Sequence, residues 1–141
     1  MAIKIANRLI RYGRSSISGV TYTREALEKM VAEWNASKKN VTLGYIPDST
    51  TPRQYLDLSR AATKVTDMWL DDEGLVVEQE ILDTPMGNIM RALVDVSLEE
   101  TVPQDRLFSL SANIVGALDN GYNGTDLKFR GVFIDAPNQD K

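Results

Sequence analysis

Two serines are the first residues that could do chemistry in this chain. Ser109 and Ser111 lie in the apolar segment LFSLSANIVG, residues 107–116. A serine hydroxyl becomes a good nucleophile only when an adjacent base takes its proton, and histidine is the usual base near neutral pH. The sequence contains no histidine and no cysteine. These 141 residues therefore cannot form a Ser-His-Asp site, use a thiolate nucleophile or bind a metal through cysteine.

Lysine is the other base that a serine could use, provided that it is buried and neutral. Lys64 and Lys128 lie in strand-like segments, but lysine is rarely buried, so we interpret both as parts of solvated strand faces. Both serines are interpreted as strand residues whose hydroxyls are hydrogen-bonded. The chain has no phosphate-binding glycine motif, and its acidic segments lack the ligand spacing of a calcium loop. We therefore expect no cofactor and no metal.

The composition indicates one globular domain of ordinary character. Of the 141 residues, 43% are hydrophobic and 26% are charged, and the net charge is −4. A negative chain is not expected to bind nucleic acid in general, because such binding needs a surplus of Lys and Arg on one face. No segment has the apolar length of a signal peptide or a membrane span. We expect no nucleic-acid or membrane partner, and a chain that stays in the cytoplasm where it is made.

Two helices must help to position the serines. Residues 23–37 carry apolar side chains at helical spacing, and Thr23 is a suitable N-cap. Residues 84–96 have the same periodicity, with Thr84 as the N-cap and a proline at the first helical position. Gly87 lies in the first turn, where glycine costs about 1 kcal/mol relative to alanine. Its presence indicates close packing against a neighbouring backbone.

Short strands account for most of the remaining sequence. We predict strands over residues 3–10, 40–46, 58–72, 73–82, 107–116 and 127–136. The acidic turn DDEG indicates that the third and fourth of these form a hairpin. Two segments are predicted to be loops, the acidic residues 97–106 and the turn-rich residues 117–126.

The order of these elements predicts an α+β fold. Short antiparallel strands dominate, so we expect a partly closed β-barrel with two packed helices. Residues 1–136 should form a single domain, and residues 137–141 a polar C-terminal tail.

Four segments in this order resemble the prohead proteases of tailed bacteriophages, whose fold is shared with herpesvirus assembly proteases. The resemblance spans roughly residues 17–136. The segments are SGVTYTREALEKMV, the central TKVTDMWLDDEGLVVEQEILDTPMGNIMRALVD, FSLSANIVG in the place of the nucleophile strand, and LKFRGVFIDAP in the place of the closing strand. No single segment is specific, and the resemblance rests on their order and spacing.

The sequence departs from this family where the family has its catalytic residues. Asp48, in GYIPDS, stands where the resemblance places the catalytic histidine. Ser111 matches the first serine of the family's Ser-Ser-Arg-Gly pattern, and the next positions hold Ala112, Asn113 and Ile114. An unperturbed aspartate, with a pKa of about 3.9, is a weak base near neutral pH. We therefore expect no catalytic residues; if the chain is active, Ser111 would be the nucleophile and Asp48 or a lysine the base.

The resemblance implies a prohead protease-like fold and a role in phage head assembly. We expect a catalytically inactive structural protein of the virion head. It would bind the major capsid protein or the scaffold as a decoration or cementing component, as a homo-oligomer or bound to the capsid. Two alternatives stay open. The chain could be an active maturation serine protease with a base other than histidine, or an inactive pseudo-protease that regulates head assembly.

Overall fold

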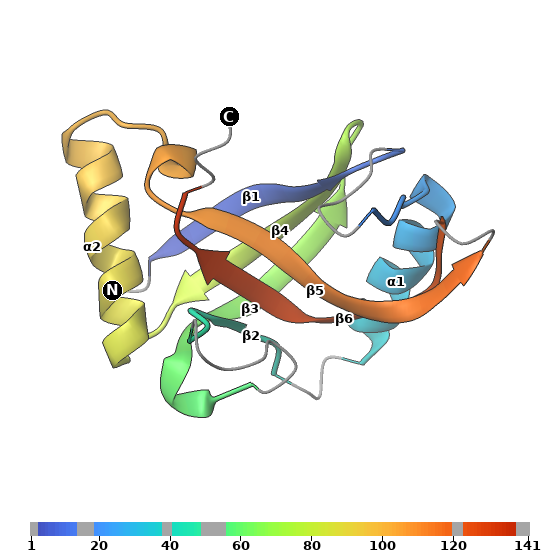
Figure 1. The fold of residues 1–141 in the computed structure, drawn as a ribbon, viewed down its shortest axis with the longest axis horizontal. Helices are drawn as coiled ribbons and strands as arrows, with labels where there is room; N and C mark the ends of the chain where they lie inside the picture. The colour runs from blue at the N-terminus through green and yellow to red at the C-terminus, as the bar shows by residue number, and fades with distance from the viewer. Residues whose placement is uncertain (1–2, 14–18, 38–40, 49–55, 120–122, 138–141) are drawn as a thin grey trace.

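A curled, mixed six-stranded sheet forms the body of the molecule, and two helices pack against it (Figure 1). The computed structural model describes residues 3–13, 19–37, 41–48, 56–119 and 123–137. The strands are β1 (Lys4–Arg11), β2 (Leu43–Tyr45), β3 (Ala61–Leu70), β4 (Gly74–Ile81), β5 (Ser109–Asp119) and β6 (Asn123–Asp135). Their order in the sheet is β1-β4-β3-β2-β6-β5, and only β2 and β6 pair in parallel. The predicted α+β class, mostly antiparallel and partly closed, is confirmed.

Helix α1 (Arg24–Ala36) lies against β6 and is held by both its apolar and its charged side chains. The Thr23 hydroxyl accepts a hydrogen bond of 3.2 Å from the Ala26 amide, which confirms the predicted cap. Leu27 and Met30 are buried in the core. On the solvent side, Lys128 of β6 forms an ion pair of 3.6 Å with Glu33.

Helix α2 (Pro85–Glu99) packs against β3 and β4. The predicted cap is confirmed, because the Thr84 hydroxyl accepts from the Gly87 amide at 2.9 Å. A Cβ atom on Gly87 would lie 1.9 Å from the carbonyl oxygen of Leu82, so the expected close backbone contact is present. The helix continues three residues beyond the predicted end. Ser97 is buried there, and its hydroxyl donates to the Val102 carbonyl.

The core lies between the concave face of the sheet and the helices. Its fully buried large side chains include Leu27, Met30, Met68, Leu75, Val77, Met90 and Val132. Two polar residues, Thr63 of β3 and Gln79 of β4, are also fully buried and are bonded to each other. In the described part of the chain, no helix is long and apolar enough to span a membrane.

The ends of several elements differ from the prediction. β5 extends to Asp119, and β6 begins at Asn123. Most of the segment that was predicted to be a turn-rich loop is therefore paired strand. An irregular register near Gly116 allows this glycine-rich segment to remain paired between β5 and β6. Residues Leu58–Arg60 form a short 3₁₀ helix before β3 instead of strand. Residues 138–141 of the predicted tail lie outside the described residues.

Candidate active site

Ser111 lies in a row of side chains that crosses three strands. It is directly opposite Phe133 of β6, and Phe133 is opposite Tyr45 of β2. Paired residues in a sheet project to the same face. The neighbouring Val132 belongs to the core, and side chains alternate along a strand, so the row projects away from that core. Figure 1 shows β5, β6 and β2 side by side in this part of the sheet.

The two serines differ in their hydrogen bonding. The Ser109 hydroxyl donates to the carbonyl oxygen of Ala136 at 3.0 Å, which agrees with the interpretation of Ser109 as a bonded strand residue. Ser111 is partly buried, and its hydroxyl has no hydrogen-bond partner among the described residues. Of the two hydroxyls, only that of Ser109 has its proton bound by a described residue.

Asp48 lies beyond the end of β2 and is not level with Ser111. The register places Tyr45 level with Ser111, about 10 Å away across two strand spacings. Asp48 follows three residues later and is partly buried. Hydrogen bonds from Ser59 lower the pKa of Asp57, and the negative charge of Asp48 opposes that shift. The charge of Asp48 therefore acts on the segment that leads into β3.

The lysines of the described residues are all exposed. Lys64 lies opposite Leu43 and Glu80, and Lys128 lies opposite Val115 and pairs with Glu33. Lys4 and Lys29 are exposed as well. This agrees with the interpretation of Lys64 and Lys128 as solvated strand residues, and it leaves Ser111 without a buried lysine in the described structure.

Tyr45 is a member of the row that sequence reasoning missed. Only 8% of its surface is exposed, and burial raises the pKa of its phenol. The phenol is therefore protonated near neutral pH, where it can donate a hydrogen bond but cannot act as a base. Only the register of β2 with β6 brings it level with Ser111, and residue spacing does not reveal that register.

A β-bulge lies two residues beyond Ser111. The register of β5 with β6 shifts between Asn113 and Ile114, opposite Gly131. Gly131 has a φ of 148°, and a Cβ atom there would lie 2.4 Å from the carbonyl oxygen of Leu43. Glycine is required at this position by both conformation and space. Bulges of this kind occur often beside active sites, where they reorient a side chain.

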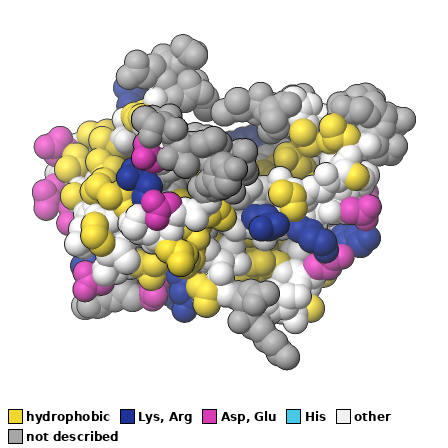
Figure 2. Space-filling view, turned by 60° about the horizontal axis from the view of Figure 1, so that its bottom comes forward, with side chains coloured by type: hydrophobic (Ala, Val, Ile, Leu, Met, Phe, Trp, Pro, Cys, Tyr) yellow, Lys and Arg dark blue, Asp and Glu magenta, His cyan; other side chains and the backbone are white. Residues whose placement is uncertain are grey.

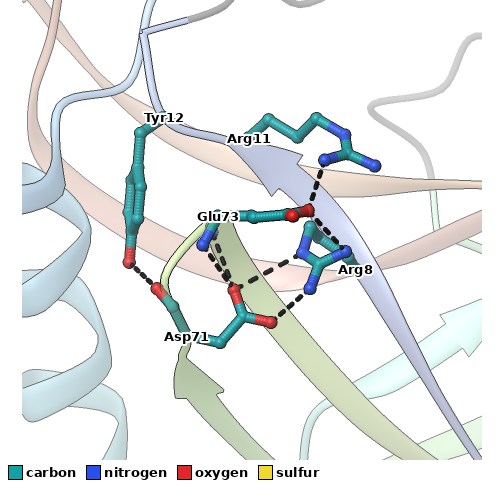
Figure 3. Close-up of polar contacts among 6 residues, drawn as sticks. Arg8, Arg11, Tyr12, Asp71 and Glu73 are labelled. Atoms are coloured by element: carbon teal, nitrogen blue, oxygen red, sulfur yellow. Dashed lines mark hydrogen bonds and ion pairs between the residues drawn. The ribbon is translucent and has the colours of Figure 1, made fainter.

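A second polar cluster closes the turn between β3 and β4 (Figure 3). The carboxylate of Asp71 accepts hydrogen bonds of 2.9 Å from the backbone amides of Glu73 and Gly74. The guanidinium of Arg8, on β1, binds both oxygens of the same carboxylate. These bonds, the one from Arg8 most of all, lower the pKa of Asp71 to about 2.

Neighbouring side chains extend this cluster toward α1. The Tyr12 hydroxyl donates to the carbonyl of Asp71 at 2.8 Å, and the guanidinium of Arg24 lies 5.5 Å from the centre of the Tyr12 ring. Arg11 forms an ion pair of 2.6 Å with Glu73. Asp71 and Glu73 of the acidic turn are thus paired with arginines, and the described residues contain no group of three or more acidic side chains arranged to hold a metal. Sequence reasoning identified the turn but not its arginine partners.

Comparison with known proteins shows that this chain resembles solved structures in its fold. No protein-family model and no curated protein matches the sequence. The capsid assembly protease gp21 of bacteriophage T4 matches with a TM-score of 0.70 and 18% identity, over 96% of this chain and 82% of that chain. The protease of varicella-zoster virus matches with a TM-score of 0.47 and 12% identity, over 96% and 64%. At these identities the likeness concerns the fold alone. The fold of this chain is that of the T4 capsid assembly protease, as the sequence resemblance predicted.

Proposed function

We propose that this protein acts in phage head assembly by binding and not by cleavage. One observation carries the proposal: a chain with the fold of a capsid assembly protease contains no histidine. The partner would be the major capsid protein or the scaffold, and the role that of a decoration or cementing component of the head. Catalysis would have been lost at the positions now held by Asp48 and by the residues after Ser111.

The surroundings of Ser111 support the loss of catalysis. Its hydroxyl has no base bonded to it among the described residues, and the described lysines are exposed. The side chain level with it on β2 is a phenol that holds its proton near neutral pH. A serine in such surroundings is a poor nucleophile.

Counting this chain in purified heads tests the proposal. Quantitative mass spectrometry of virions and of immature heads should give a simple ratio of this chain to the major capsid protein. Absence of the chain from both, in an infection that produces it, would overturn the proposal. A few copies in immature heads that contain cleaved scaffold would instead favour the maturation protease.

Labelling by a serine-directed phosphonate then separates binding from cleavage. The proposed function predicts no labelled chain, either free or in immature heads. Labelling that is lost in Ser111→Ala, but kept in Ser109→Ala, would establish an active serine and overturn the loss of catalysis. Asp48→Asn would then show whether the aspartate is the base, because loss of its carboxylate should slow labelling.

A further inference from the structure

Helix α2 has an apolar surface that the core covers only in part. Its buried side consists of Gly87, Met90, Val94 and Ser97. Beside this side, at helical spacing, run Met86, Ile89, Leu93 and Val96, which we call the α2 stripe. Ile89 is 46% exposed and Val96 is partly exposed, whereas Met86 and Leu93 are partly buried and pack against the core. The apolar part of α2 is therefore wider than its contact with β3 and β4 requires.

The other helix shows what an ordinary exposed face looks like in this protein. On α1 the exposed positions are mostly charged, as in Arg24, Glu28 and Lys29. The contrast with α2 is plain in Figure 2, where hydrophobic side chains gather at the end of the molecule where α2 lies, bordered by acidic side chains. Apolar patches with a polar rim are typical of docking surfaces.

The charges around the α2 stripe specify the kind of partner. Asp83 precedes the helix, and Glu99 and Glu100 end it, with no basic residue in the last turn. The C-terminal end of a helix carries a partial negative charge, so acidic side chains there are unfavourable. None of the three forms an ion pair with a described residue. This end of α2 is therefore a negative site beside an apolar one.

A second copy of the chain does not fit this surface well. Two α2 helices packed antiparallel would bring Asp83 of one copy close to Glu99 and Glu100 of the other. Packed in parallel, they would bring the same acidic ends together. Both arrangements oppose like charges.

We propose that the α2 stripe docks an amphipathic helix whose apolar face is flanked by Lys or Arg. Ile89 and Val96 would contact the apolar face of that helix. Glu99 and Glu100 would pair with its basic residues, which would also relieve the charge at the end of α2. The inference rests on the proposed function only for the statement that this helix belongs to a capsid or scaffold protein.

A defined peptide pair tests the chemistry of the surface. The probes are two fluorescent amphipathic helices of equal length, one of Leu and Lys and one of Leu and Glu, with binding followed by anisotropy. The wild-type chain should bind the Leu/Lys peptide roughly tenfold or more tightly than the Leu/Glu peptide. The double variant Ile89→Ser/Val96→Ser should weaken binding by roughly tenfold. Val115→Ser/Leu118→Ser, which alters two exposed apolar residues on β5, should leave it unchanged.

Charge reversal separates docking from folding. Glu99→Lys/Glu100→Lys should raise the melting temperature, because cations are favourable at a helix C-terminus, and yet weaken binding of the Leu/Lys peptide. Binding that is unaffected by this variant or by Ile89→Ser/Val96→Ser would overturn the inference. So would a wild-type dimer in sedimentation experiments that Ile89→Ser/Val96→Ser converts to monomer, since a second copy would then occupy the stripe.

Incorporation into heads distinguishes this inference from the proposed function. Both the proposed function and the docking inference are supported by one result. The wild-type chain is found in heads, the copy number of Ile89→Ser/Val96→Ser is reduced, and that of Val115→Ser/Leu118→Ser is unchanged. Normal copy number of the α2 variant would overturn the docking inference and leave the proposed function standing. Peptide binding that follows the predicted pattern, in a chain absent from heads, would overturn the proposed function alone.

Discussion

Thr63 of β3 donates a hydrogen bond of 2.6 Å to the amide oxygen of Gln79 on β4, and neither residue is exposed to solvent. β2 passes so close to this pair that a Cβ atom on Gly44 would lie 2.1 Å from the Thr63 hydroxyl. Within the described part of the chain, the amide nitrogen of Gln79 has no hydrogen-bond partner. The pair therefore joins two strands at the centre of the sheet while leaving one buried donor unsatisfied.

Removing only one member of this pair should destabilise the fold. Thr63→Val leaves both ends of the Gln79 amide unpaired and should lower the free energy of unfolding by about 1–3 kcal/mol. Thr63→Val/Gln79→Met removes both polar groups and should cost less than the single variant. Urea unfolding of the two variants and the wild type measures this. If the double variant loses as much free energy of unfolding as the single variant, or more, the contribution of Thr63 is not its hydrogen bond.

Gly87 should be intolerant of alanine even though alanine favours helix. Alanine gains about 1 kcal/mol over glycine in a helix interior. The added Cβ, however, would lie 1.9 Å from the Leu82 carbonyl oxygen, which is backbone and cannot move aside easily. Gly87→Ala should therefore lower stability by about 1–3 kcal/mol. Asn88→Ala, at the next and exposed position, is the control and should be neutral or stabilising. A stabilised Gly87→Ala variant would contradict the contact.

The two helix caps should differ in importance. Thr84 accepts from Gly87 and also donates to the carbonyl of Ala61 on β3 at 2.7 Å, so it joins α2 to the sheet. The side chain of Thr23 makes only the capping bond from the Ala26 amide among the described residues. Thr84→Ala should cost about 1–2 kcal/mol, and Thr23→Ala about 0.5–1 kcal/mol. Thermal unfolding of both variants tests which cap contributes more to stability, with Thr84→Ser as a variant that keeps the hydroxyl.

The sequence predicts the elements well because each has a local cause. Apolar periodicity and Thr caps define both helices, and the DDEG turn defines the β3–β4 hairpin. The predicted ends of elements were wrong where tertiary contacts determine at which residue the element ends. Burial of Ser97 lengthens α2, and irregular pairing near Gly116 keeps a glycine-rich segment in strand.

The candidate site was only partly predictable for the same reason. Ser111 was identified because it lies in an apolar strand and because the resemblance places it there. Tyr45 comes level with it only through the parallel pairing of β2 with β6. The Arg8 and Asp71 side chains are 63 positions apart in the chain, and only the β1–β4 register brings them together. Long-range register of this kind leaves no local pattern.

The bond between Arg8 and Asp71 should make stability depend on pH. The folded-state pKa of Asp71, about 2, lies below the ordinary value of 3.8, so folding favours the ionised carboxylate. Its contribution is fully present above about pH 4 and is lost as the pH falls through 4 toward 2. Asp71→Asn should therefore destabilise the protein most at neutral pH, and its difference from wild type should shrink below pH 4.

Urea unfolding at pH 7, 5, 3 and 2 measures this dependence. Asp72→Asn removes the same charge from the same turn, but no bond between Asp72 and Arg8 is present in the described structure. Its difference from wild type should be smaller at pH 7. Arg8→Gln should reproduce the pH profile of Asp71→Asn in part, because the backbone amides of Glu73 and Gly74 still bind the carboxylate. An Asp71→Asn difference that stays constant from pH 7 to 2 would show that the turn depends on the shape of the side chain and not on its charge.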